Sequence, residues 1–143
     1  MYRHPSDEEI QELLRKSKTV AVVGLSGKTD RDSYRVAKYM QDQGYRIIPV
    51  NPRLKSVLGE ASYPSLSSIP EKVDIVNVFR RSELVLPIVE EALQISPRAI
   101  WLQLGIVNEE AAERALAAGV DFVMDRCIKI EHQRLFSTGG NGL

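Results

Sequence analysis

Short apolar runs alternate with amphipathic stretches along most of the chain, and this alternation predicts its secondary structure. Runs rich in Val, Ile, Leu and Ala between turn-forming residues are typical of buried strands. We predict five strands, at residues 19–23, 45–50, 74–79, 99–104 and 122–124. Apolar residues spaced three and four apart between these runs predict helices. The order of elements favours an α/β fold, with a doubly wound, mostly parallel five-stranded sheet flanked by helices.

Residues with N-cap chemistry precede three of the expected helices. They are Ser6, which forms a capping box with Glu9, then Ser82 and Asn108. A further helix is expected to start near Asp32 or Ser33. A last helical stretch runs through Phe136, and we expect the glycine-rich residues 137–143 to be a flexible tail. The connection over residues 51–72 is long, with a short helical turn expected near Ser65–Ser68. Connections of this length in a compact domain are often functional.

Length and composition indicate one domain over residues 1–143, with a helix in residues 1–17. Basic and acidic residues balance at 19 each, which argues against a nucleic-acid partner. Cys127 is the single cysteine, so no internal disulfide forms and a reducing compartment is favoured. No apolar run approaches the roughly 20 residues of a membrane helix, and the N-terminus does not resemble a signal peptide. We therefore expect a cytoplasmic protein without a membrane partner.

The loops after the predicted strands carry the distinctive chemistry. In doubly wound sheets ligands bind beyond the carboxyl ends of the strands, where the strand order reverses. The first such loop holds Gly24, Ser26 and Gly27, followed by Lys28 and Arg31 before a helix start. Backbone N–H groups and the helix dipole favour an anion there, so we expect a phosphate-bearing ligand. A plain strand–helix turn, with glycine supplying a positive φ, remains the alternative.

Neither of the common nucleotide fingerprints is present. Ser26 interrupts the G-x-G-x-x-G pattern, and no Walker Lys-Ser pair follows. The second strand ends in Asn51, Pro52, Arg53 and Lys55, without the carboxylate that holds a free ribose diol in NAD-binding domains. This end therefore suits a phosphorylated ribose, a requirement that NADP also satisfies.

The third and fourth strands end in further candidate ligand groups. Arg80 and Arg81, after Phe79, suit bidentate phosphate binding or stacking on a purine. Alternatively they are solvated or pair with Glu83. Gln103 offers an amide and Gly105 allows close approach of a ligand, whereas Trp101 alternates with them and is expected in the core.

No catalytic set stands out from the sequence. Cys127 and Glu131 share a helix face, but His132 is displaced from it. A nucleophile needs an adjacent base, and one Cys, one His and one Glu fall short of a closed zinc site. We expect Cys127 to be a packing residue and the protein to be a binder, with neither catalytic nor metal-binding residues.

From about Thr19 to His132 the chain resembles the small stand-alone CoA-binding proteins of Rossmann type, akin to the amino-terminal domain of the succinyl-CoA synthetase α subunit. The resemblance lies in the order and spacing of several short segments. They are residues 23–26, 31–34, 45–52, 78–81, 101–105, 125–127 and 131–132. The larger synthetases carry a catalytic phosphohistidine in a further domain that this chain lacks, so the resemblance implies binding without catalysis.

The resemblance implies CoA, or an acyl-CoA, as the ligand. Gly24, Ser26 and Gly27 would cradle the diphosphate with Arg31 and Ser33 nearby; Asn51, Pro52 and Lys55 would border the adenosine and its 3′-phosphate; Phe79, Arg80 and Arg81 would line the adenine or phosphate side; and Gln103 and Gly105 the pantetheine side. We expect Gly24→Val to abolish binding by occupying the diphosphate position. An NADP-binding oxidoreductase domain and an accessory subunit with an unidentified protein partner stay open as alternatives.

Overall fold

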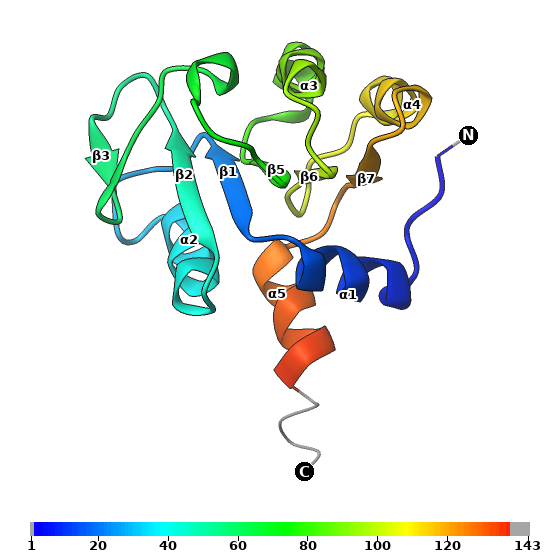
Figure 1. Ribbon diagram of the computed structural model, residues 1–143, viewed down its shortest axis with the longest axis horizontal. Coiled ribbons are helices and arrows are strands. Elements are labelled where there is room, and N and C mark those ends of the chain that lie inside the picture. The colour runs from blue at the N-terminus through cyan, green and yellow to red at the C-terminus, as the bar shows by residue number, and fades with distance from the viewer. Residues whose placement is uncertain (1, 138–143) are drawn as a thin grey trace.

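The computed structural model describes residues 2–137 and shows a five-stranded parallel sheet between two layers of helices (Figure 1). The strands are β1 (Thr19–Val23), β2 (Arg46–Val50), β5 (Ile75–Val78), β6 (Ala99–Leu102) and β7 (Asp121–Val123), in the order β2-β1-β5-β6-β7. Each neighbouring pair is parallel. The predicted Rossmann-like fold class is confirmed.

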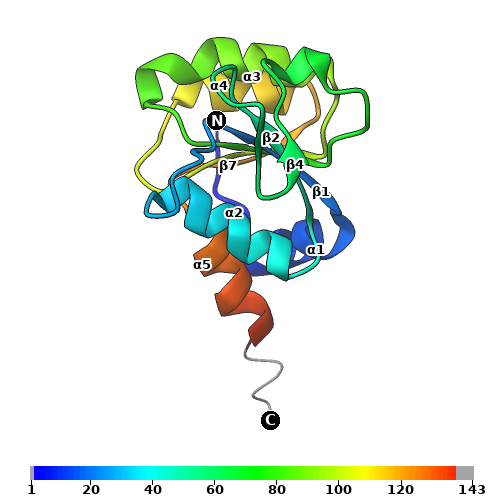
Figure 2. The same cartoon turned by 90° about the vertical axis from the view of Figure 1, so that its left-hand side faces the viewer.

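Helices cover both faces of the sheet, as Figure 2 shows from the side. They are α1 (Asp7–Lys16), α2 (Asp32–Asp42), α3 (Val85–Gln94), α4 (Glu109–Ala117) and α5 (Ile128–His132). α3 and α4 pack on one face, and α1, α2 and α5 pack on the other, each layer with its own apolar cluster. Trp101 is fully buried between sheet and helices, and its Nε1 donates to the Arg126 carbonyl at 2.8 Å. The core placement of Trp101 is therefore confirmed.

Helix α2 begins at Asp32, as predicted, and two of the predicted N-caps form as expected. The Ser6 Oγ accepts from the Glu9 N–H at 3.1 Å, and the Glu9 Oε1 accepts from the Ser6 N–H at 2.7 Å, which completes a capping box. The Asn108 Oδ1 caps α4 by accepting from the Ala111 N–H at 2.9 Å. These side chains satisfy N–H groups that the first helical turn leaves without partners.

The prediction that Ser82 caps a helix is wrong. A 3₁₀ turn, η2 (Ser82–Leu84), precedes α3 instead. The Ser82 Oγ accepts from the Val107 N–H at 3.0 Å, and so connects the loop after β5 to the loop after β6. The hydroxyl that was expected to cap the helix thus accepts from an N–H group 25 residues away in the sequence.

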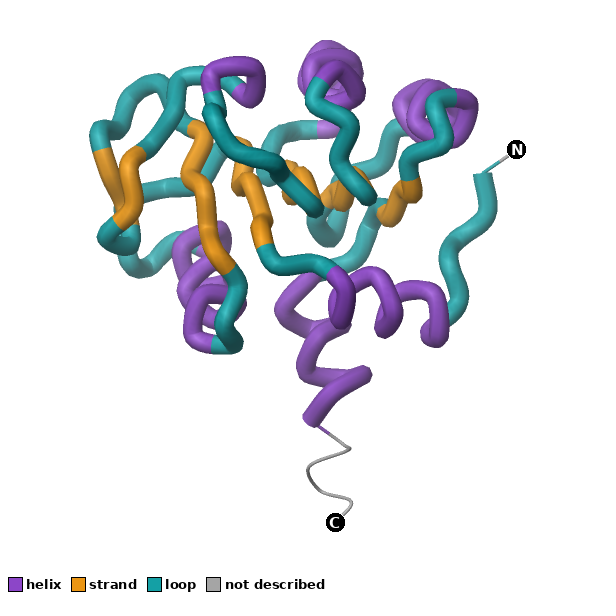
Figure 3. Tube along the Cα trace, viewed as in Figure 1, coloured by secondary structure: helices purple, strands orange, loops and turns teal. Residues whose placement is uncertain are grey.

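The connection over residues 51–72 contains a hairpin that the sequence did not predict. Strands β3 (Ser56–Val57) and β4 (Glu60–Ala61) pair antiparallel, and the hairpin lies beside β2 (Figure 3). Leu58 and Gly59 at its tip both have positive φ, 56° and 76°, as a two-residue type I′ turn requires. The expected helical turn is confirmed as η1 (Leu66–Ser68).

The C-terminal helical stretch is also confirmed. α5 continues into a π-helical turn, η3 (Gln133–Ser137), while residues 138–143 of the predicted tail lie outside the described residues. Over residues 2–137, no helix combines the length and apolar character that a membrane span requires.

Candidate functional site

The strand order reverses between β1 and β5. The chain leaves β1 for β2 on one side, and returns through β5 to build β6 and β7 on the other. The loops that follow β1 and β5 therefore separate at the carboxyl edge of the sheet, which is where ligands bind in doubly wound folds. Gly24 and Phe79 are the first residues of these two loops.

Gly24 permits the two loops to meet. Its φ is +86°, and its N–H donates to the Val50 carbonyl at 3.0 Å. A Cβ atom on Gly24 would lie 2.6 Å from the Phe79 carbonyl oxygen. The expected reason for the effect of Gly24→Val is therefore wrong, because the new side chain would collide with protein backbone before it reached a ligand. Glycine is needed here for the turn itself.

The loop after β1 and the start of α2 line a cavity of about 480 Å³, which we name the α2 cavity. Among its walls are the predicted residues Gly24, Ser26, Arg31, Ser33 and Phe79. Ser33 Oγ accepts from the Ser26 N–H at 3.0 Å, and this bond fixes the loop to the helix start. The N-cap residue of α2, Arg31, makes no side-chain cap bond. The positive end of an 11-residue helix faces this cavity, and the carboxylates of Asp30 and Asp32 also line it; Asp32, in the first helical turn, is paired with Arg35.

A second cavity, of about 900 Å³, lies between the loops after β5 and β6 and helix α5, and we name it the α5 cavity. It contains the predicted residues Phe79, Arg80, Arg81, Gln103 and Gly105. The two cavities share Asp32 and Phe79, so they adjoin. Their sizes fall within the roughly 300–1,000 Å³ of small-molecule sites. One extended ligand could occupy both.

Gln103 is a buried polar group directed at the α5 cavity, with 7% of its surface exposed. Its Oε1 accepts from the Ile128 N–H and from the Asn77 Nδ2, each at 3.4 Å. Because a backbone N–H can only donate, the atom facing it must be the oxygen. The Nε2 has no hydrogen-bond partner among residues 2–137, and is the side-chain donor that remains for a ligand.

The remaining predicted residues, Gly27, Asn51, Pro52 and Lys55, are not among the residues that line either cavity. The Asn51 amide is engaged within the protein: its Nδ2 donates to the Leu25 carbonyl at 3.0 Å, and its Oδ1 accepts from the Arg53 N–H at 2.9 Å. Gly27 lies against the Leu54 side chain. Pro52 and Lys55 are exposed at the end of β2. These residues shape and border the rim outside the cavities.

Three arginines at the carboxyl edge have no acidic partner. Arg31, Arg53 and Arg80 follow β1, β2 and β5, are exposed, and form no ion pair within residues 2–137. Every other arginine of the chain lies within 4.0 Å of a carboxylate. The pairing of Arg81 with Glu83, at 3.6 Å, is confirmed, whereas Arg80 has no such partner. The edge thus presents spare guanidinium groups suited to phosphate.

Sequence reasoning missed the walls that helices contribute. Arg35 of α2, together with Lys129, Ile130 and Gln133 from the C-terminal helical stretch, lines the α5 cavity. Arg35 lies four residues after Arg31 and hence on the same side of α2, a spacing that could have suggested it. The C-terminal residues reach the cavity only through tertiary packing, for which the sequence held no signal.

Cys127, Glu131 and His132 do not form one site, because their side chains lie in different surroundings. His132 is buried in an aromatic cluster, where its Nδ1 hydrogen-bonds to the Tyr39 hydroxyl at 2.7 Å. Burial lowers the pKa of His132. Glu131 pairs with Arg126 at 3.2 Å and Arg134 at 2.7 Å. Only Cys127 lines the α5 cavity, and residues 2–137 contain no cluster of three metal-ligating side chains.

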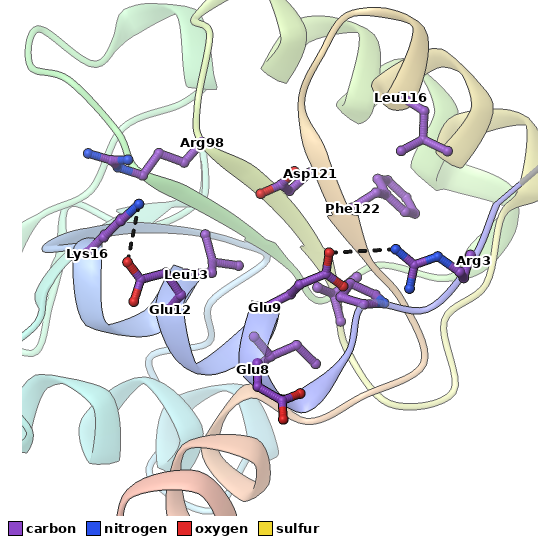
Figure 4. Close-up of a pocket in the computed structure, with 13 residues that line it drawn as sticks. Arg3, Glu8, Glu9, Glu12, Leu13, Lys16, Arg98, Leu116, Asp121 and Phe122 are labelled. Carbon is purple, nitrogen blue, oxygen red and sulfur yellow. Dashed lines mark ion pairs between the residues drawn. The ribbon is translucent and has the colours of Figure 1, made fainter.

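A cavity of about 460 Å³ also lies at the opposite, amino edge of the sheet, between α1, β7 and α4 (Figure 4). Its cations are matched by its own acids: Arg3 lies 3.6 Å from Glu9, and Lys16 lies 3.2 Å from Glu12. Paired surface charges leave little net attraction for a further anion. The amino-edge cavity is therefore the poorer candidate for a phosphate-bearing ligand.

The parallel sheet and the cavities at its reversal point define the chain as a Rossmann-like α/β domain. Residues 18–133 match the family model described as CoA binding domain, and the chain belongs to this family. The resemblance inferred from the sequence is thereby confirmed.

Similar proteins include both small and large chains. The uncharacterized protein YneT of Bacillus subtilis (strain 168) is 48% identical over 130 residues, which cover 91% of this chain and 96% of YneT. A solved structure of a hypothetical protein from Pyrococcus horikoshii OT3 is 38% identical with a TM-score of 0.89, covering 94% of this chain and 97% of that one. Acetate–CoA ligase [ADP-forming] I of Archaeoglobus fulgidus is 34% identical over 78% of this chain, which spans only 18% of that enzyme.

Proposed function

We propose that this protein binds CoA or an acyl-CoA at the carboxyl edge of its sheet and does not itself catalyse a reaction. The observation that carries the proposal is a set of arginines without an acidic partner among residues 2–137, namely Arg31, Arg53 and Arg80, at the ends of three adjacent strands. CoA carries a diphosphate and a separate 3′-phosphate, so it needs cations at more than one place. Membership of the CoA-binding domain family supports the same ligand.

The diphosphate would occupy the α2 cavity, near Arg31, Arg80 and the start of α2. Helix N-termini and guanidinium groups are both established phosphate ligands in proteins. The nucleoside would extend toward the end of β2, where Arg53 and Lys55 are exposed near the position expected for the 3′-phosphate. The pantetheine arm would pass Phe79 into the α5 cavity and reach Gln103.

Binding without catalysis is proposed because the cavities offer no nucleophile with a positioned base. Within residues 2–137 no histidine lines either one, and His132 is held by Tyr39 outside them. Cys127 lines the α5 cavity without a base as a hydrogen-bond partner. The ligase activity printed for the Archaeoglobus relative belongs to a chain of which this one matches a small part.

Isothermal titration of ligand-free protein with CoA, dephospho-CoA and NADP tests the proposal. We expect CoA to bind most tightly, and Arg31→Ala to weaken it about tenfold, the value of a charged hydrogen bond worth about 1.5 kcal/mol. The matched control is Arg98→Ala, an exposed arginine before β6 at the amino edge, which should leave the affinity unchanged. Tighter binding of NADP would favour an oxidoreductase domain, and no binding of any of the three would favour an accessory subunit.

A further inference from the structure

Two exposed apolar side chains lie in the wall of the α5 cavity. Leu104, 61% exposed, and Ile130, 50% exposed, are the most exposed large hydrophobic residues within the described part of the chain. They come from different elements, the loop after β6 and helix α5, and both line this cavity. Apolar surface gains free energy when it is removed from water, so a ligand with an apolar group would be stabilised between them.

A hydrogen-bond donor lies in the same cavity. The Gln103 Oε1 is held by the Ile128 N–H and Asn77, and its Nε2 has no partner within residues 2–137. Because no buried side-chain N or O atom among residues 2–137 lacks a partner, the Nε2 is open to solvent, and a carbonyl group on a ligand would take the place of water there. The cavity therefore combines one directed amide donor with an apolar rim.

On the basis of the CoA-binding function proposed above, we propose that the physiological ligand is a CoA thioester with an apolar acyl chain. The Gln103 Nε2 donates a hydrogen bond to the thioester carbonyl, and the side chains of Leu104 and Ile130 cover the acyl carbons. The free thiol of CoA would leave both side chains in water. A second copy of the chain is a less suitable cover, since the rim continues into a cavity that a flat protein surface would leave unfilled.

The charges around the cavity favour a neutral acyl group over an acidic one. Arg80 lines the cavity without an acidic partner, but the function proposed above assigns it to the diphosphate. Arg35 is paired with Asp32, and Arg81 is paired with Glu83. Lys129 lies 5.6 Å from the centre of the Tyr39 ring, a cation–π contact directed at the protein itself. An acyl carboxylate would have to compete with these partners, whereas methylene groups need only Leu104 and Ile130.

Titration with CoA, acetyl-CoA, butyryl-CoA, hexanoyl-CoA and succinyl-CoA tests this proposal. We expect affinity to rise along the neutral series, by up to about fourfold for each methylene that becomes buried. Leu104→Ser and Ile130→Ser should remove this rise, so that butyryl-CoA and hexanoyl-CoA bind these variants no more tightly than CoA does. The control is Leu116→Ser, which replaces an exposed leucine of the amino-edge cavity and should preserve the whole series.

Equal affinities for CoA and the neutral thioesters would overturn the acyl proposal while leaving CoA binding intact, and so would a preference for succinyl-CoA. Failure of all the compounds to bind would instead overturn the proposed function. Intact-mass spectrometry of the incubated protein adds a further outcome. An unmodified mass supports binding of an intact thioester. Acylation that is lost in Cys127→Ser would overturn it, because the acyl group would then have moved from CoA to the Cys127 sulfur with release of the CoA thiol.

Discussion

The two edges of the sheet carry the same kinds of side chain but satisfy them differently. At the amino edge, Arg46 pairs with Glu71 at 2.6 Å and with Glu60 at 3.1 Å, and the cations around the nearby cavity also have acidic partners. At the carboxyl edge, Arg31 and Arg80 have none among residues 2–137. A cation satisfied by its own chain stabilises the fold, whereas an unsatisfied one is available to a ligand. Among the arginines of residues 2–137, a missing acidic partner therefore distinguishes the proposed binding edge better than the presence of a cavity does.

The largest expected effect comes from replacing glycine at each edge. Gly24→Ala places a Cβ against the Phe79 carbonyl and forces a positive φ, which alone costs about 1–3 kcal/mol. Gly119→Ala, before β7 at the amino edge, also has positive φ but meets nothing within 4 Å. Urea unfolding should show a clearly greater loss of stability for Gly24→Ala. Equal losses would mean that the contact with Phe79 does not constrain the site.

Neighbouring arginines provide the next contrast. We expect Arg80→Ala to weaken CoA binding about tenfold to a hundredfold, since a hydrogen bond to a charged group contributes about 1.5–3 kcal/mol. Arg81→Ala should have a severalfold smaller effect, because Arg81 already pairs with Glu83. Isothermal titration calorimetry of both variants with CoA measures the two affinities. The reverse ranking would contradict the link between missing partners and ligand binding.

A pH dependence should arise away from the carboxyl edge, at His132. Burial lowers its pKa, so below the ordinary value of 6.5 the unfolded chain binds more protons than the folded one. The free energy of unfolding should fall as the pH drops from 6.5 through the lower folded pKa, by at most about 1.4 kcal/mol per pH unit.

His132→Gln should flatten that slope between pH 7 and pH 5 in urea titrations and leave CoA affinity unchanged. Asp7 and Glu71, whose pKa values hydrogen bonds to Arg134 and Arg46 lower, contribute stability that is lost only at more acidic pH, below their ordinary values of 3.8 and 4.5. They therefore do not obscure the slope that His132 causes between pH 7 and pH 5. A slope that persists in His132→Gln would assign the effect to another group.

The smallest expected effect concerns the exposed end of β2. Arg53→Ala should reduce the preference for CoA over dephospho-CoA by at most about fivefold, because exposed ion pairs contribute about 0.2–1 kcal/mol. The affinity for dephospho-CoA itself should remain unchanged. If both ligands weaken equally, Arg53 acts on another part of the ligand or on the loop.

Local signals explain what the sequence predicted well. The apolar runs located all five strands of the main sheet, and side-chain chemistry located the helix starts at Ser6 and Asn108. Because loops after parallel strands gather at one edge, most of the candidate site residues were placed near one another before the structure was known.

Long-range packing explains what the sequence could not predict. Strands of two residues, as in β3 and β4, are too short to show an alternating pattern. Ser82 and Asn51 have suitable chemistry for a helix cap and a ligand contact, but Val107 and Leu25 engage them instead. Ile130 becomes a wall of the site because α5 packs near residues far earlier in the chain.

The contact between Gly24 and Phe79 has a consequence for how affinity arises in this fold. Since two backbone segments already pack against each other there, a ligand bound at this edge would meet a preorganised floor of backbone. Little chain entropy would then be lost on association. Selectivity among ligands then resides in the side chains of the rim, which are free to vary without disturbing that floor.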